Sequence, residues 1–138
     1  MTIRLRAHHL LCMLTYAGRG YSPAFTANYD RLAARIAAGE DLLLVQGPDD
    51  ICRPLLAGQA PHCLRRGPAE RDAAAATALA RLLDRPIAPG IRLVPDDALL
   101  ERLRAAFAKG STRKACLGCE WSDFCSSIAR DGFRAAAL

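Results

Sequence analysis

Three cysteines stand close together near the end of the chain, in the array Cys116-x2-Cys119-x5-Cys125. A short loop that carries three thiols can bring them to one point, and thiolates bind Zn(II) or iron–sulfur clusters. A disulfide uses only two sulfurs, so the triplet leaves one sulfur over and calls for a fourth ligand. The array therefore requires a fold that brings another part of the chain to this loop.

Whether the six cysteines form disulfides or act as thiols and metal ligands depends on the redox state of the cellular compartment. The chain starts with Arg4 and Arg6, and the apolar run after them is short, interrupted by His8 and His9, and without a small-residue cleavage site. We expect this start to be a folded helix of a cytoplasmic protein, not a targeting peptide. No stretch approaches the roughly 18–20 apolar residues of a membrane span. In a reducing compartment, metal ligands and buried thiols are expected more than disulfides.

The net charge of +5 raises the question of a nucleic-acid partner. Arginines are spread over every segment and mixed with Asp and Glu, which is typical of solvated surface charge. The local pairs Arg65-Arg66 and Arg113-Lys114 both lie beside cysteines, where positive charge favours thiolates. We therefore do not expect nucleic acid as a partner.

The apolar patterning predicts a single domain over residues 1–138, with a helix-rich α+β fold. Four to five helices, one or two short strands and cysteine-bearing loops are expected. The predicted helices lie over Ala7–Tyr16, between Ser22-Pro23 and Gly39, from Pro68 to before Pro86, between Asp96 and Gly110, and over Asp123–Arg130. The predicted strands lie over Leu42–Val45 and Ile91–Val94.

The number and spacing of the cysteines favour one iron–sulfur cluster over a zinc ion or two clusters. Structural zinc sites usually show two short-spaced pairs, and here only Cys116 and Cys119 form one. A [4Fe-4S] cluster is wider and tolerates the x5 spacing to Cys125 and a remote fourth ligand. Cys52 and Cys63, at the two ends of an irregular loop, are near equals for that role; Cys52 is preferred because a turn after a strand fixes it. Two clusters would need about eight ligands, more than six cysteines supply.

Other candidate groups have plainer interpretations. Cys12 is a further candidate for the fourth ligand, but inside an apolar helix it is interpreted as a buried thiol. His8 and His9 can share a helical face with Cys12 as a metal corner or proton relay. The favoured interpretation is that their ring nitrogens bond backbone groups at the edge of the core. Asp49, with the acidic residue after it, most simply forms a turn. His62 is either a ligand or part of the loop surface.

Two resemblances bear on the cofactor. The cysteine array resembles the last three ligands of the cluster loop in endonuclease III-type DNA glycosylases. Lys109 stands where those enzymes have their first cysteine, so the likeness supports a cluster but not glycosylase chemistry. A second resemblance rests on these segments: Arg6-Ala7-His8-His9-Leu10-Leu11-Cys12, Gly20-Tyr21-Ser22-Pro23, Asn28-Tyr29, Gly47-Pro48-Asp49-Asp50-Ile51-Cys52 and Cys116-x2-Cys119-x-Trp121.

These segments look like the DUF1284 family, small bacterial and archaeal proteins without an established activity. The resemblance implies an iron–sulfur cofactor and no particular reaction. Many members carry a further cysteine three residues after the position of Cys52; this chain has Leu55 there, which weakens a two-cluster interpretation.

The function expected from the sequence is electron transfer or redox sensing with a redox partner protein, through one [4Fe-4S] cluster. All-thiolate ligation without an open iron suits one-electron transfer better than substrate activation, so an enzyme is not the favoured interpretation. The alternative is a structural zinc protein that serves as an interaction or nucleic-acid-binding module. The sequence does not indicate an oligomeric state.

Overall fold

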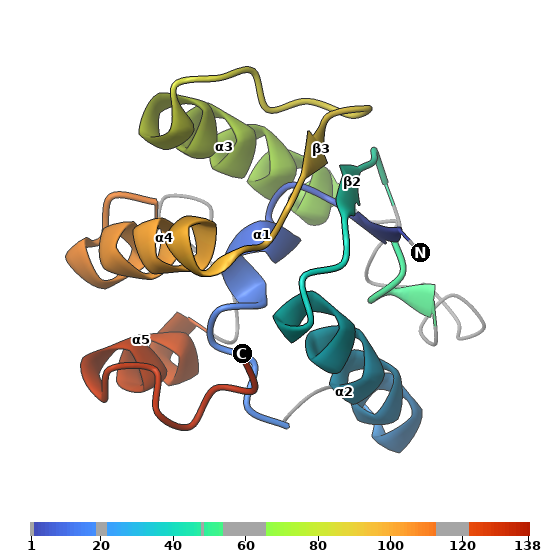
Figure 1. The fold of residues 1–138 in the computed structure, drawn as a ribbon, viewed down its shortest axis with the longest axis vertical. Coiled ribbons are helices and arrows are strands. Elements are labelled where there is room, and N and C mark those ends of the chain that lie inside the picture. The colour runs from blue at the N-terminus through green and yellow to red at the C-terminus, as the bar shows by residue number, and fades with distance from the viewer. Residues whose placement is uncertain (1, 19–21, 48, 54–65, 113–121) are drawn as a thin grey trace.

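The computed structural model describes residues 2–18, 22–47, 49–53, 66–112 and 122–138 (Figure 1). In these residues the chain forms five helices and three short strands, so the helix-rich α+β prediction is confirmed. The elements in chain order are β1 (Ile3–Leu5), α1 (His9–Cys12), α2 (Pro23–Ala37), β2 (Leu42–Leu44), α3 (Arg66–Leu83), β3 (Arg92–Leu93), α4 (Asp97–Lys109) and α5 (Ser122–Arg130).

The three strands form one small sheet in the order β1-β2-β3. β2 pairs parallel with β1, with Leu5 opposite Leu44, and antiparallel with β3, with Leu42 opposite Leu93. A parallel pair needs a crossover connection, and the segment with α1 and α2 provides it. Because β1 is fixed in the sheet beside β2, the chain that leaves β1 leads directly into α1.

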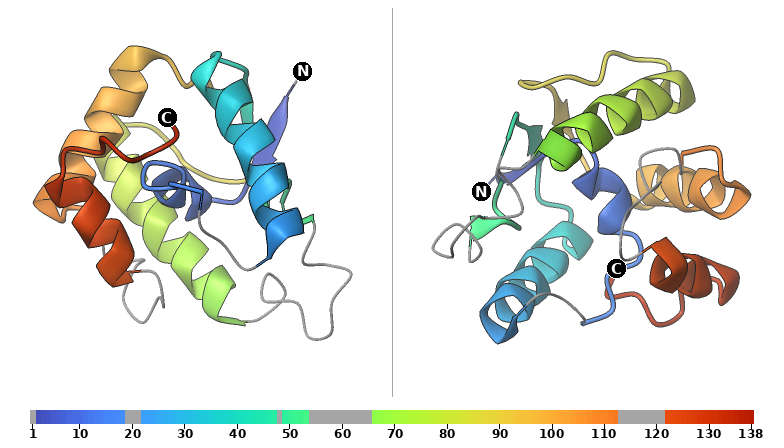
Figure 2. Two further views of the ribbon diagram at one scale, coloured as in Figure 1. Left: turned by 90° about the horizontal axis from the view of Figure 1, so that it is seen from below. Right: turned by 180° about the vertical axis from the view of Figure 1, so that it is seen from behind.

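Helix α1 lies at the centre of the molecule, and α2, α3, α4 and α5 surround it in the different views (Figures 1 and 2). Its apolar side chains and those just after it, Leu10, Leu11, Met13 and Leu14, are at most 1% exposed. A polar group on this segment is removed from water and has to find its partners within the protein.

Helices α2 and α4 begin and end where the sequence predicts, whereas α3 begins at Arg66, two residues before the predicted start at Pro68. The Ser22 side chain accepts a hydrogen bond from the backbone N–H of Phe25 at 3.1 Å and caps α2. The Asp96 side chain does the same for Leu99 at 2.8 Å and caps α4. Gly110 ends α4 with a φ of +83°, in the left-handed region that glycine adopts without steric cost.

The N-terminal segment differs from the prediction. Residues 3–5 form a strand rather than the start of a helix, with Ile3 and Leu5 buried and Arg4 exposed. Helix α1 covers only His9–Cys12 of the ten residues expected, and the chain continues beyond it in tight turns. A segment buried on all sides is apolar on every face, so its pattern does not distinguish one helical turn from a long helix.

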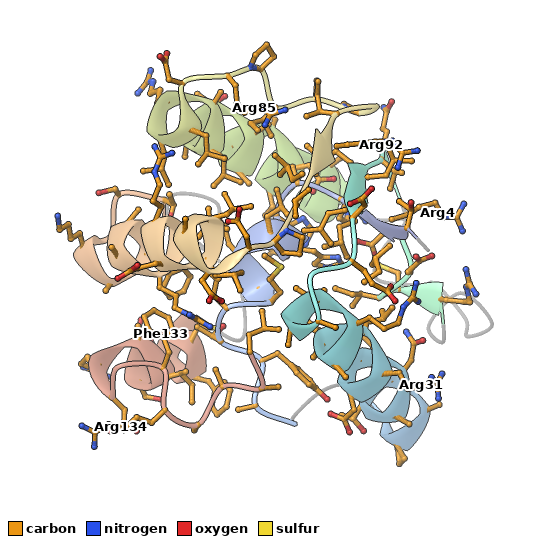
Figure 3. All side chains as sticks on the ribbon, in the orientation of Figure 1. Arg4, Arg31, Arg85, Arg92, Phe133 and Arg134 are labelled. Carbon is orange, nitrogen blue, oxygen red and sulfur yellow. The ribbon has the colours of Figure 1, made fainter. Side chains whose placement is uncertain are left out.

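Arginine side chains are spread over the surface. Figure 3 shows Arg4, Arg31, Arg92 and Arg134 pointing outward from different parts of the fold. Among the described residues, no helix is both long enough and apolar enough to cross a membrane.

Candidate metal centre

Asp49 connects the loop after β2 to Arg6, the residue that follows β1, and to α1. Its side chain is fully buried and accepts four hydrogen bonds. One oxygen accepts from the backbone N–H groups of Ile51 (3.0 Å) and Cys52 (3.1 Å). The other accepts from the backbone N–H of Arg6 (2.8 Å) and from Nδ1 of His9 (2.6 Å). Because a carboxylate offers about four lone-pair positions, Asp49 is saturated by these donors.

Burial raises the pKa of Asp49, but the neighbouring His9 and the hydrogen bonds outweigh it and hold this pKa below its ordinary value. Asp49 is therefore an ionised carboxylate, and Nδ1 of His9 is the donor. The turn expected at this position is present, and the same side chain also orients a histidine of α1.

Asp72 of α3 holds the residues before α1 in a similar way. It accepts hydrogen bonds from the backbone N–H of His8 (3.1 Å), from Nδ1 of His8 (2.7 Å) and from Nε of Arg6 (2.9 Å). Burial lowers the pKa of His8 to about 4, and the adjacent His9 also contributes. His8 is neutral at pH 7, with its proton on Nδ1 facing Asp72.

The two histidines thus form a matched pair. Their rings lie 4.4 Å apart at 61°, and each Nδ1 contacts a carboxylate from a different element, Asp72 for His8 and Asp49 for His9. Metal-binding histidines commonly donate one ring N–H to a carboxylate, which fixes the tautomer and the ring orientation. The arrangement leaves Nε2 of each ring as the nitrogen able to bind a metal or accept a proton.

One group of potential ligands includes His9, Asp49 and Cys52, whose ligand atoms all lie within 4.8 Å of one another. Nitrogen, oxygen and sulfur donors of this kind suit zinc or iron. Asp49 already accepts four hydrogen bonds, so its present role is to orient His9. Cys52 takes part in a disulfide whose partner lies outside the described residues, and its sulfur becomes a ligand only after reduction.

A second group, the cysteines Cys12 and Cys125, lies near the C-terminal end of α1. Cys125 of α5 accepts a hydrogen bond from the Thr15 hydroxyl at 3.1 Å. The same hydroxyl lies 3.4 Å from the backbone carbonyl of Cys12. Of the described cysteines, Cys12 and Cys125 are not disulfide-bonded. One hydroxyl thus joins the last cysteine of the C-terminal array to the end of α1.

Tyr29 of α2 reaches the same interior region. Burial raises the pKa of its hydroxyl well above the usual range, and the charges of Cys12, Asp49 and Cys125 raise it further. The hydroxyl has no hydrogen-bond partner among the described residues. Its ring stacks on Tyr16 with centroids 3.8 Å apart, so aromatic packing fixes its position.

The structure describes two of the five predicted ligands. Cys52 and Cys125 lie at the two groups just described. Cys63, Cys116 and Cys119 lie outside the described residues, as does His62.

Sequence reasoning missed Asp72, Thr15 and Tyr29 as contributors to the site. Tyr29 belongs to the Asn28-Tyr29 segment of the family resemblance, but nothing in that segment indicates a role at a metal centre. Thr15 carries no local motif, and Asp72 lies in an alanine-rich helix where it resembles ordinary surface charge. The favoured interpretation of His8 and His9, in which the ring nitrogens bond backbone groups, is wrong about the partners: each Nδ1 contacts a side-chain carboxylate.

These features define a small, helix-rich α+β protein with histidine, carboxylate and cysteine side chains gathered around a central helix. The chain belongs to the DUF1284 family, described as "Protein of unknown function (DUF1284)", whose model matches residues 20–125. The matched stretch contains Tyr29, Asp49, Cys52, Asp72 and Cys125 and begins after the histidine pair. No curated protein and no solved structure matches the chain.

Proposed function

We propose that this protein binds one iron–sulfur cluster, of the [4Fe-4S] type, and acts in electron transfer or redox sensing with a partner protein. The observation that carries the proposal is the position of Cys125, the last residue of the C-x2-C-x5-C array, beside Thr15 and Cys12 at the central helix. Cys116, Cys119 and Cys125 would supply three thiolates, and the sequence offers Cys52 or Cys63 as the fourth.

The surroundings of Cys125 suit such a group. When bound, a cluster of this kind accepts one electron from a reduced partner carrying a flavin or another cluster, and passes one electron to an oxidised partner. The Thr15 hydroxyl, which is on a residue only 1% exposed, donates to the Cys125 sulfur and stabilises its thiolate. The buried hydroxyl of Tyr29 adds a second polar donor to this region.

The carboxylate contacts of α1 support the same function by fixing the position of the central helix. Asp72 binds the residues before α1 from α3, and Asp49 binds His9 from the loop after β2. A redox centre works best when its ligands move little between oxidation states, and a helix held from two sides provides that rigidity.

The test is iron and acid-labile sulfide analysis, with a visible spectrum, on protein purified without oxygen. We expect about four iron and four sulfide per chain. Cys125→Ser should lose the chromophore, whereas Ser127→Ala, an exposed position on the same helix, should keep it. Zinc without sulfide, or an intact visible spectrum in the Cys125 variant, would refute the proposal.

A second candidate function is a structural zinc protein that serves as an interaction module. The observation favouring it is the proximity of His9, Asp49 and Cys52, because zinc accepts nitrogen, oxygen and sulfur ligands together. Zinc binding there requires reduction of the Cys52 disulfide and replacement of the hydrogen bond between His9 and Asp49 by metal contacts. This candidate predicts a colourless protein with about one zinc ion per chain and no redox activity. Metal content and colour alone separate the two candidates.

A further inference from the structure

We propose that Cys12 is a ligand of the same centre as Cys125, and that the Tyr29 hydroxyl donates a hydrogen bond to a sulfur of that centre. This inference rests on the proposed iron–sulfur function. It assigns the remaining ligand position, for which the sequence favours Cys52 or Cys63, to a residue interpreted from sequence as an inert buried thiol.

The first argument is the place of Cys12 in the fold. Cys12 is the last residue of α1, the helix that the other four surround (Figures 1 and 2). The Thr15 hydroxyl contacts both the Cys12 carbonyl and the Cys125 sulfur, at 3.4 and 3.1 Å. The last cysteine of the C-terminal array is therefore next to the turn that carries Cys12, although 110 positions separate Thr15 from Cys125 in the chain.

The second argument is the hydroxyl of Tyr29. A buried hydroxyl without a partner costs about 1–3 kcal/mol, so an acceptor at this place would stabilise the fold. Asp49 is near, but four other donors already use its oxygens. The other acidic groups that raise the pKa of the Tyr29 hydroxyl include Cys12 and Cys125. A thiolate or sulfide accepts a hydrogen bond, and Tyr29, which keeps its proton here, donates one.

The third argument concerns the competing ligand Cys52. Its sulfur is held in a disulfide, and its backbone N–H is bound to Asp49 in a tight turn. The potential metal ligands grouped with it are His9 and Asp49, a mixed donor set unlike the all-thiolate ligation of an electron-transfer cluster. Among the described cysteines, Cys12 and Cys125 are the two that are not disulfide-bonded. Both contribute to raising the pKa of the Tyr29 hydroxyl.

The main test compares Cys12→Ser with Cys52→Ser, both purified without oxygen. Loss of one second-shell contact costs metal affinity roughly 10–100-fold, so loss of a ligand should lower the affinity at least about tenfold and leave iron and sulfide depleted after purification. We expect that loss in the Cys12 variant and full occupancy in the Cys52 variant. A loaded Cys12 variant, or loss of iron only in the Cys52 variant, would overturn the assignment.

A second variant keeps the proposal testable if Cys12→Ser does not fold. Tyr29→Phe removes only the hydroxyl and keeps the ring that stacks on Tyr16. Hydrogen bonds to cluster sulfurs raise the reduction potential, so this variant should keep its iron and titrate at a lower potential than the wild type. Tyr16→Phe is the matched control, because the Tyr16 hydroxyl bonds Asp30 at 2.6 Å, and should leave the potential unchanged.

An unchanged potential in Tyr29→Phe would overturn the proposed hydrogen bond. Wild-type protein without iron or sulfide would instead refute the proposed function itself. The two failures are thus distinguished by the wild-type analysis, before any variant is compared.

Discussion

Replacing Asp49 with asparagine tests how the centre of the fold is held. The amide oxygen can accept from two donors, for example the backbone N–H groups of Ile51 and Cys52, but the amide nitrogen accepts none. That nitrogen would then face the backbone N–H of Arg6 and the ring of His9, which are donors to Asp49 in the native protein. His9 can change tautomer and accept, whereas the backbone N–H of Arg6 is left without its acceptor.

The magnitude follows from the lost contacts. An unsatisfied buried donor costs about 1–3 kcal/mol, and hydrogen bonds to a charged group exceed neutral ones by about 1 kcal/mol each. Together these effects should lower the free energy of unfolding by about 3–5 kcal/mol, the range found when one partner of a buried charged pair is removed. That is a large share of the ~5–15 kcal/mol that stabilises a typical domain.

The assay is urea unfolding of the metal-free protein at pH 7, followed by circular dichroism. Asp50→Asn is the matched control, because Asp50 accepts from the backbone and guanidinium of Arg4 and from Arg53 near the surface. Exposed ion pairs of this kind contribute about 0–1 kcal/mol. Equal losses in the two variants would show that Asp49 does not hold the centre as argued.

Three further predictions test other parts of the structure. Burial lowers the pKa of His8 from 6.5 to about 4. Between these pH values the unfolded chain binds a proton at His8 and the folded chain does not, so acid favours unfolding. The free energy of unfolding should therefore fall by about 3 kcal/mol as the pH drops from 6.5 to about 4. Urea midpoints of the metal-free protein across this range should show the loss, and His8→Gln should reduce it. Ser22→Ala removes the side-chain acceptor for Phe25 N–H and should cost about 1 kcal/mol in thermal unfolding, whereas no change would show that this cap is unimportant. Thr15→Val removes the donor to Cys125 and should lower the reduction potential of the loaded protein in a redox titration; an unchanged potential would contradict that role.

Local signals were sufficient to locate the longer helices. Ser22 and Asp96 cap helices through a side-chain oxygen only three residues from the N–H that it accepts from, and Gly110 ends a helix by adopting a positive φ. Interactions of this range involve neighbours along the chain, so they are readable without knowledge of the fold.

The start of the chain needed the tertiary structure. Three residues, Ile3–Leu5, alternate too briefly to predict a strand, and they form one because β2 lies alongside them. Their outer edge is covered by Asp49 and Asp50, whose carboxylates accept from the backbone N–H groups of Arg6 and Arg4. These two carboxylate contacts join residues more than 40 positions apart, so no local sequence pattern predicts them.

The candidate metal centre, like the fold, could be predicted only in part from the sequence. Cysteine spacing by itself predicted a site near Cys125, since a short turn can bring three thiols of this spacing to one point. Asp72 contacts His8 across 64 positions, and Thr15 contacts Cys125 across 110. Only the folded chain creates such contacts, because burial of α1 at the centre forces its polar groups to find partners on whichever elements pack around it.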